Sequence, residues 1–568
     1  MDRFLDYQKW NQNLPAQPDD NFLKFIDGDT ALSNKLREKW LYQLARQKDW
    51  PNFSIHYKPS LDVNLQCFAQ IALFNEGKIE EALQNAKQLW LSVDSSTPVC
   101  TLLFSLLLKS DHFDEQLITQ RIVLALDKRN ISLARSLLKL YKQPRTKDEQ
   151  LLSAINQTPA RIAQLEPGLL HDYFYLFGLK RMIASNMTQA INFWLTPKTH
   201  KFLNEAQQQS FLVQLALYKA MRNHEDEPIW FAKIKPNFYT DALLDWQIRF
   251  ALKRLQWREV ERLINNSPDK DKPCWQYWLA RALEAKGSTA KAEEIYQAIS
   301  KSRNYYGFLA SMRLNQTPSF ENESTSNLAR LKDYQPITNL VKTLYLSKQS
   351  LQASRLLTDF LSELPKEDKS AMIYWIANVL QWYGKSVYLS NSEEQLSNQL
   401  SLRFPVIYLN AVQLNSKNYQ IPAELIYAII RQESGFRDDV ISPAGARGLM
   451  QVMPSTASVV AKHEKIAYND KNQLFTSEKN IHIGVAYLKQ LKARYRNHPV
   501  LIAAAYNAGP SQVNYWLKNH TPKDMDIWID TLPWHETRNY LKNIIAFYAV
   551  YQYRLQQKPN LSAFMQPL

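Results

Sequence analysis

Residues 421–436 read IPAELIYAIIRQESGF. Leu425, Ile429 and Glu433 are spaced four residues apart, which places them on one face of a helix. The proline near the start of this stretch suits a first helical turn, and Gly435 suits the exit from the helix. The pattern therefore predicts an apolar helix with a carboxylate on its buried face, at its C-terminal end.

Glu433 would be withdrawn from water at that position, which disfavours its charged form and raises its pKa. A general acid that works near neutral pH requires such a shift. A lone glutamate near a helix end is more often a solvated surface residue, so its surroundings must decide. Gly435, Gly445 and Gly448 follow closely, and glycine lets a backbone approach a ligand, although a plain loop would explain the same residues.

The composition favours a helical protein of several domains. A chain of 568 residues is too long for a single hydrophobic core. It contains only 12 glycines, so few turns need a positive φ angle. Apolar residues make up 45% of the chain and aromatic residues 12%, which is typical of a well-packed globular protein and not of a disordered one.

The formal net charge of +15 is compatible with nucleic acid, an anionic membrane or an acidic polymer as partner. Dense clusters of Lys and Arg interleaved with aromatic residues are absent from the sequence, so nucleic-acid binding is not favoured. The sequence also lacks a run of 18 apolar residues, so we expect no transmembrane segment.

The three cysteines, Cys67, Cys100 and Cys274, form neither a CxxC motif nor a cluster with histidine. No zinc site is therefore indicated, and we expect no metal and no organic cofactor. Cys67 and Cys100 lie about one helical hairpin apart and would pair in an oxidising compartment. Three buried free thiols are equally compatible with these positions.

Residues 1–315 read as one helix after another. A pattern of small residues around a turn recurs at Gly77 and Gly287, and Asn186 occupies the turn of a similar segment. Such helix-turn-helix units stack into a superhelical solenoid, because each unit buries its apolar face on the next.

A polar stretch at 316–327 reads as a linker, and residues 328–402 return to helical periodicity. The last domain is expected at 404–568, with an irregular or hairpin region at 441–453. A helix is expected to start at Pro454.

Four blocks of sequence resemble the soluble lytic transglycosylases, which cleave bacterial peptidoglycan. The blocks are ESGF at 433–436, SPAGARGLMQVMP at 442–454, AAYNAGP at 504–510 and ETRNY at 536–540. The resemblance implies a mainly all-α fold of three parts. These are a ring-like α-superhelical domain over 1–315, a small helical linker domain over 328–402, and a lysozyme-like α domain with minor β structure over 404–568, close to goose-type lysozymes.

The resemblance also implies the chemistry. Glu433 would act alone, first as acid and then as base, on the β-1,4 bond between N-acetylmuramic acid (MurNAc) and N-acetylglucosamine (GlcNAc). The C6 hydroxyl of the same muramic acid would attack C1 and close a 1,6-anhydro ring, without water. Glycosidases otherwise use two carboxylates. The implied role is cell-wall turnover and remodelling, and a ring-like array suggests exo action on a threaded strand.

The resemblance assigns a further set of residues to substrate binding. Ser442 and Gln451 would offer hydrogen bonds, Met453 an apolar wall, and Tyr506 a hydroxyl that orients the N-acetyl group. The full set that is expected to line the groove is Ser442, Gln451, Met453, Tyr506, Asn507 and Glu536.

Peptidoglycan lies outside the cytoplasm, so the resemblance implies a periplasmic protein whose signal peptide has been removed, and it favours the Cys67–Cys100 pair. We expect a monomer that binds glycan strands with their stem peptides, and cell-wall synthesis or turnover proteins as further partners. Two alternatives stay open. A lysozyme-type hydrolase would need a second carboxylate to activate water, and a non-catalytic wall-binding scaffold would need no carboxylate at all.

Overall fold

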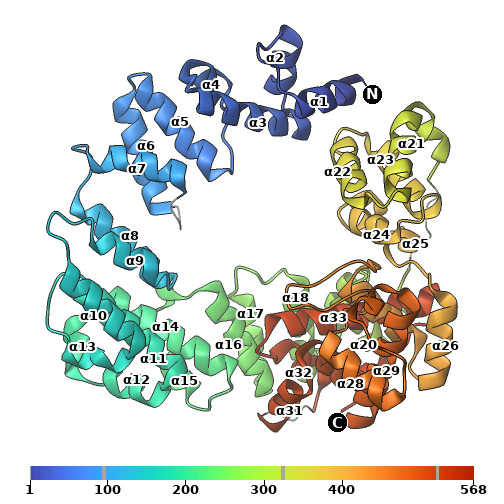
Figure 1. Ribbon diagram of the computed structural model, residues 1–568. Coiled ribbons are helices and arrows are strands. Elements are labelled where there is room, and N and C mark those ends of the chain that lie inside the picture. Colours follow the sequence, from blue (N-terminus) through green and yellow to red (C-terminus); the bar gives the residue numbers. More distant parts are fainter. Residues whose placement is uncertain (1, 93–96, 321–325, 520–522, 568) are drawn as a thin grey trace. The chain divides into compact units, whose positions relative to one another are not determined.

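The computed structural model describes residues 2–92, 97–320, 326–519 and 523–567 of the chain. Its regular elements in these ranges are helices (Figure 1). The β pairing within the same ranges consists of two isolated antiparallel bridges, Ile441 with Arg447 and Arg447 with Val452. The predicted all-α class is confirmed, and the bridges lie in the segment where an irregular hairpin was expected.

The chain divides into two compact units. The first unit comprises Met1–Tyr218, Pro228–Tyr239 and Arg355–Glu363. The second unit comprises Lys219–Glu227, Thr240–Ser354 and Leu364–Leu568. The domain bounds expected at 1–315, 328–402 and 404–568 describe a different partition and stay predictions. The linker expected at 316–327 falls partly on residues 321–325, which lie outside the described residues.

The first half of the chain is a succession of short and medium helices. They are α1 Asp2–Gln12, α2 Asp20–Asp27, α3 Ala31–Gln47, α4 Trp50–His56, α5 Val63–Asn75, α6 Ile79–Ser92, α7 Pro98–Leu108, α8 Glu115–Asp127, α9 Ile131–Leu138, α10 Thr146–Gln157, η1 Pro159–Gln164, α11 His171–Ser185, α12 Met187–Trp194, α13 Pro197–Phe202, α14 Glu205–Met221, α15 Glu227–Phe231, η2 Pro236–Phe238, α16 Asp241–Lys253, α17 Trp257–Asn265, α18 Pro273–Ala285, α19 Thr289–Ile299 and α20 Tyr305–Arg313.

The second half continues in the same way. Its elements are η3 Leu328–Tyr334, α21 Gln335–Leu346, α22 Ser350–Leu361, α23 Lys366–Asn378, α24 Tyr383–Asn391, η4 Glu394–Leu396, α25 Leu400–Arg403, α26 Leu409–Tyr419, α27 Ala423–Glu433, α28 Pro454–Glu464, η5 Lys471–Phe475, α29 Ser477–Arg494, α30 Pro499–Ala508, α31 Pro510–Asn519, α32 Met525–Thr531, α33 His535–Arg554 and α34 Ser562–Met565. The helix start expected at Pro454 is confirmed.

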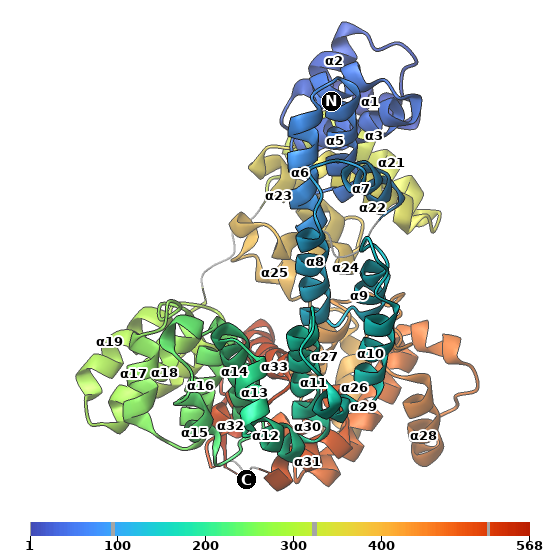
Figure 2. The same cartoon turned by 90° about the vertical axis from the view of Figure 1, so that its left-hand side faces the viewer.

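The expected helix-turn-helix units are present. Gly77 lies between the packed helices α5 and α6, and Gly287 lies between α18 and α19. Both glycines have positive φ angles, 86° and 83°. Glycine adopts such angles more readily than other residues, because it has no Cβ atom. Asn186 caps α12 by accepting a hydrogen bond from the Gln189 backbone N–H. The α18–α19 hairpin is seen in Figure 2.

A disulfide joins two helices of the first unit. Cys67 in α5 and Cys100 in α7 are bonded, with their Cα atoms 5.3 Å apart. Cys274 in α18 is a free thiol. Of the two possibilities that the sequence left open, the structure contains the pair.

The disulfide closes a loop between positions 33 residues apart, which restricts the unfolded chain. We expect Cys67→Ala with Cys100→Ala to lower the free energy of unfolding of the first unit by about 3 kcal/mol, measured by urea denaturation of the oxidised protein. The matched control is Cys274→Ala, which leaves the pair intact. Equal stability of the double variant and this control would contradict the prediction.

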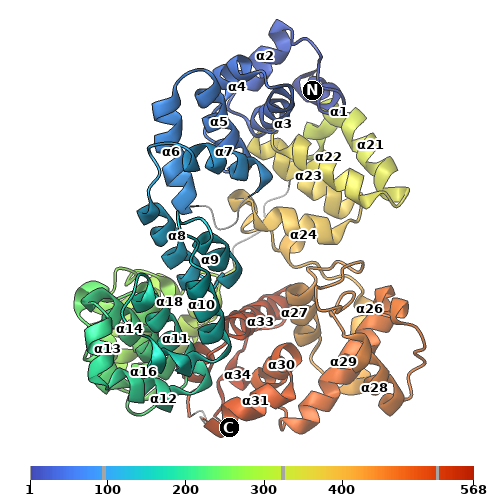
Figure 3. The same cartoon turned by 60° about the vertical axis from the view of Figure 1, so that its left-hand side comes forward.

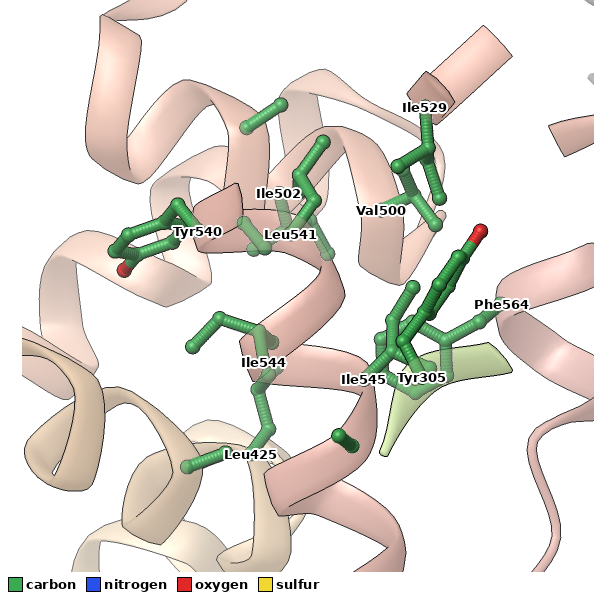
Figure 4. Packing of buried hydrophobic residues seen from close by; sticks show 14 of the residues in the cluster. Tyr305, Leu425, Val500, Ile502, Ile529, Tyr540, Leu541, Ile544, Ile545 and Phe564 are labelled. Atoms are coloured by element: carbon green, nitrogen blue, oxygen red, sulfur yellow. The ribbon is translucent and has the colours of Figure 1, made fainter. Parts of the chain in front are cut away.

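The core of the second unit is built around α27 and α33, which pack side by side (Figure 3). Leu425 of α27 lies beside Ile544 of α33, and both are buried (Figure 4). The ring of Tyr427 stacks on that of Tyr551 at 5.0 Å between centroids. The last residue of α27, Glu433, is therefore held against the first turns of α33.

Buried polar contacts hold α33 to neighbouring helices of the same unit. Asp530, near the end of α32, is paired with Lys542 of α33. It also accepts hydrogen bonds from Tyr306 Oη at 2.9 Å and from Trp278 Nε1 at 2.8 Å. Burial opposes ionisation of this carboxyl, but the cations Lys542 and Arg249 hold its pKa below the usual value.

None of the described helices has both the length and the apolar character needed to cross a bilayer.

Candidate active site

The carboxylate of Glu433 sits where α27 ends. Ser434 is the C-cap, and the next two residues, Gly435 and Phe436, both have positive φ angles, 58° and 69°, which turn the chain away from the helix axis. Behind Glu433, Leu425 and Ile429 are 3% and 0% exposed. The predicted apolar face and its terminal carboxylate are both present.

Three effects together raise the pKa of Glu433 to about 7. Burial raises the pKa most, a hydrogen bond from Tyr540 lowers it, and the negative charge of Glu536 raises it. The Tyr540 hydroxyl donates to Oε1 of Glu433 at 2.8 Å. At neutral pH the carboxyl is therefore close to half protonated, so it can both give and take a proton.

Tyr506 faces the same carboxylate from α30. Burial raises the pKa of Tyr506 well above its usual value, and the charge of Glu433 is the next cause. Its hydroxyl donates to the backbone oxygen of Met450 at 2.7 Å. Because its proton is already engaged, the phenolic oxygen of Tyr506 is the atom left to accept a further hydrogen bond.

The loop between α27 and α28 carries three of the predicted residues. Ser442 Oγ accepts a hydrogen bond from the backbone N–H of Ala446 at 3.0 Å and so closes a tight turn. Gln451, with a φ of 47°, donates from Nε2 to the oxygen of Gly448 at 2.8 Å. Met453 precedes α28 and is 36% exposed. Two of these side chains thus brace the loop on which they sit.

Asn480 of α29 holds this loop in place through three hydrogen bonds to backbone groups. It is fully buried, and its Nδ2 donates to the backbone oxygens of Arg447 at 2.9 Å and Leu474 at 2.7 Å. Its Oδ1 accepts from the backbone N–H of Met450 at 2.8 Å. Gly448 has a φ of 71°, and a Cβ atom there would collide with the Leu474 oxygen, so the close approach requires glycine.

Asn507 links α30 to α33, because its Oδ1 accepts a hydrogen bond from Thr537 Oγ1 at 2.8 Å. The structure thus gathers Tyr506 and Glu536 around Glu433, and Tyr506 connects them to the loop through Met450. Within the described part of the chain, no hydrogen bond joins Ser442, Gln451 or Asn507 directly to Glu433.

Known proteins share this architecture. A family model described as "Transglycosylase SLT domain" matches residues 410–529. The soluble lytic murein transglycosylase of Escherichia coli K12 is 27% identical over 98% of this chain and 88% of its own length. An inactive glutamate-to-glutamine mutant of lytic transglycosylase Slt from Pseudomonas aeruginosa superposes with a TM-score of 0.85, at 26% identity, over 98% of this chain and 92% of that one.

The 70 kDa soluble lytic transglycosylase of Escherichia coli, at 26% identity, superposes with a TM-score of 0.77 over 100% of this chain and 94% of its own. The likeness therefore extends along the whole chain and beyond the matched segment. Residues 410–529 match the transglycosylase SLT domain, and nearly the whole chain is similar to soluble lytic murein transglycosylases. Glu433, the loop, Tyr506 and Asn507 lie inside the segment that the family model matches, whereas Glu536 and Tyr540 lie after it.

Two residues that organise the site are not among those that the sequence assigns to it. Tyr540 closes the ETRNY block at 536–540, but the block by itself does not show that its hydroxyl reaches Glu433. Asn480 stood in a helix and had no evident partner. Their roles depend on contacts made across 107 and 30 residues of chain. Among the residues that the structure describes, no cluster of His, Cys, Asp and Glu could hold a metal ion.

Asn480→Ala should lower the free energy of unfolding by about 3 kcal/mol, because it leaves the buried backbone N–H of Met450 and the carbonyl of Leu474 without their partners and removes one of the two hydrogen bonds to the Arg447 carbonyl. Urea denaturation gives the value. Asn469→Ala, an exposed change on the neighbouring segment, is the control and should stay within about 0.5 kcal/mol of wild type. Similar losses in both variants would refute the anchoring role.

Two substitutions should move the pKa of Glu433 in opposite directions. Tyr540→Phe removes a hydrogen bond that lowers this pKa, so it should rise above about 7; Glu536→Gln removes a charge that raises it, so it should fall. Titration of ¹³C-carboxyl-labelled glutamate by NMR measures both, with the signal identified by its loss in Glu433→Gln. A shift of the same sign in both variants would contradict this account.

The same shift affects stability. The pKa of Glu433 is higher in the folded protein than its ordinary value of 4.5, so the folded state binds the proton more tightly. The resulting stabilisation is complete below pH 4.5 and is lost as the pH rises through about 7.

Proposed function

We propose that this protein is a lytic transglycosylase that cleaves the β-1,4 bond between MurNAc and GlcNAc in peptidoglycan. The observation that carries the proposal is Glu433: a carboxyl with a pKa of about 7, at the end of a buried helix, within the matched transglycosylase segment. A relative with 26% identity is inactivated by exchange of one glutamate for glutamine, which is consistent with a single decisive carboxyl.

Glu433 acts first as the acid. It protonates the glycosidic oxygen while the bond to C1 of the muramic acid breaks. The N-acetyl group of that sugar stabilises the developing positive charge. We assign Tyr506 to this step. Its phenolic oxygen can accept a hydrogen bond from the acetamido N–H while its own O–H still donates to the backbone oxygen of Met450.

Glu433 then acts as the base. Its carboxylate removes the proton of the C6 hydroxyl, whose oxygen attacks C1 and closes the 1,6-anhydro ring. The reaction consumes no water, and the proton that Glu433 gave is returned to it. The attacking group is tethered to the same sugar, so the step gains from proximity. Tyr540 stabilises the carboxylate and Glu536 the neutral acid, which balances the two roles.

The loop and α33 bind the sugars around this bond. For Gln451 the amide nitrogen is occupied by Gly448, so a contact with substrate comes from its oxygen. For Asn507 the oxygen is occupied by Thr537, so its amide nitrogen is the donor. Met453, partly exposed, provides an apolar wall. Ser442 and Glu536 complete the groove, with Glu536 toward the peptide-bearing sugar.

We further propose that the protein acts in the periplasm as a monomer, in cell-wall turnover and remodelling. The Cys67–Cys100 disulfide supports an oxidising compartment. Glycan strands with their stem peptides are the proposed partners, together with cell-wall synthesis or turnover proteins. Exo action, and the three-part division at 1–315, 328–402 and 404–568, are proposed from the family resemblance.

Hydrolysis by the same fold is the second candidate, and one observation favours it. Glu536 is a second carboxylate close enough to raise the pKa of Glu433. An inverting hydrolase would use such a group to activate water. If Glu536 has that role, Glu536→Gln should abolish cleavage, whereas a binding role predicts weaker substrate affinity and unchanged products.

The decisive experiment is mass spectrometry of the muropeptides released from purified sacculi. Wild-type protein should release products one water lighter than the reducing forms, and Glu433→Gln should lower the rate at least about a hundredfold without loss of fold. Glu478→Gln, an exposed change on α29, is the matched control. Reducing ends would identify a hydrolase, and intact sacculi with retained binding would identify a scaffold.

A further inference from the structure

A second pocket lies within the second unit, and none of the predicted site residues lines it. Its volume is about 240 Å³, comparable to about eight water molecules. It has room for the end of a short peptide and not for a folded partner. The described residues that line it are Met221, Arg222, Asn223, His224, Lys253, Tyr515, Trp516, Trp528, Thr531, Leu532 and Pro533.

Two lining residues carry buried polar atoms that have no hydrogen-bond partner. They are Nε1 of Trp516, a donor, and Oδ1 of Asn223, an acceptor. Trp516 is only 4% exposed. Buried polar atoms are almost always paired in folded proteins, because an unpaired one loses its bonds to water without replacement. One donor and one acceptor around the same pocket fit a ligand that offers both an oxygen and an N–H.

The pocket is also positively charged. Arg222 and Lys253 contribute to its wall, and no acidic residue is among the described lining residues. Burial and, to a lesser degree, the cations Arg538 and Arg254 together lower the pKa of Lys253 to about 8. Among the described residues no ion pair to Lys253 is formed, and its Nζ lies 5.9 Å from the centre of the Trp246 ring. A bound anion would offset the repulsion between the Lys253 ammonium and these neighbouring cations.

Aromatic rings form the rest of the wall. Trp516 packs edge-on against Trp528 at 6.4 Å and against Trp534 at 5.4 Å between ring centroids. Leu532 and Pro533 continue directly into α33, whose first turn carries Glu536. The pocket and the candidate active site are therefore built on the same segment of chain.

We propose that this pocket binds the carboxylate-bearing end of a peptidoglycan stem peptide. Lys253 pairs with the carboxylate, while Trp516 and Asn223 supply the neutral donor and acceptor for the peptide group. Inorganic phosphate would also pair with Lys253 and would offer a P–OH group to Asn223, so it is the competitor in the test. The identity of the peptide rests on the proposed function, whereas the need for an anion that carries both a hydrogen-bond donor and an acceptor rests on the pocket alone.

Ligand-observed NMR on the full chain tests the proposal. The probe is the free tripeptide L-alanyl-γ-D-glutamyl-meso-diaminopimelate, and the comparison ligand is the same tripeptide with its carboxyl groups converted to amides. The acid should bind and the amide should not. Lys253→Met should weaken binding at least about tenfold, because a charge-assisted hydrogen bond is lost. The matched control is Lys291→Met, an exposed lysine on α19, which should bind as wild type.

A second variant keeps the test valid if Lys253→Met fails to fold. Asn223 has a φ of 58°, so Asn223→Gly keeps the backbone unstrained while removing the unpaired oxygen, and it should also weaken binding. Undiminished binding in both variants, or displacement of the peptide by inorganic phosphate, would overturn the proposal. Absence of peptide binding to the wild-type protein would also overturn the proposal. If the same preparation still released 1,6-anhydro products from sacculi, the proposed function would stand without it.

Discussion

The packing of α27 against α33 is the constraint on which the second unit depends. The same contact buries Leu425 and Ile544, stacks Tyr427 on Tyr551, and brings Tyr540 to Glu433. Hydrophobic burial supplies the driving force, and the geometry of the site is a consequence of it. The 2.8 Å hydrogen bond from Tyr540 to Glu433 spans the two helices, so it depends on their relative position.

The position of α33 depends in turn on polar contacts that are unusual for a core. Asp530 is fully enclosed yet ionised, because Lys542, Tyr306 and Trp278 all satisfy it. Tyr306 and Trp278 belong to α20 and α18, so helices from the middle of the chain help to hold α33 through Asp530. This explains why residues 240–354 join the last part of the chain in one compact unit.

Opposed effects set the pKa of Glu433. Burial alone would keep the carboxyl neutral, and the Tyr540 hydroxyl alone would keep it charged. The negative charge of Glu536 adds to the effect of burial. The proposed mechanism needs such a balance, because in it the same group loses and regains a proton in each cycle.

Much of this protein follows from the sequence alone. The helical class, the turns at Gly77 and Gly287, the helix that ends at Glu433 and the loop at 441–453 all depend on local patterns, namely spacing, glycine and proline. The family blocks identified Glu433, Tyr506 and Glu536, because each block is short and contiguous. The pairing of Cys67 with Cys100 stayed open, because sequence separation does not place two sulfur atoms.

The tertiary structure decided what depends on contacts between distant residues. Tyr540 reaches Glu433 across 107 residues, and Asn480 fixes a loop that ends almost 30 residues before it. In the sequence, the first resembles a core aromatic residue and the second a polar residue in a helix. Hydrogen-bond partners and burial set their roles and the pKa of Glu433, and both arise only when the helices pack.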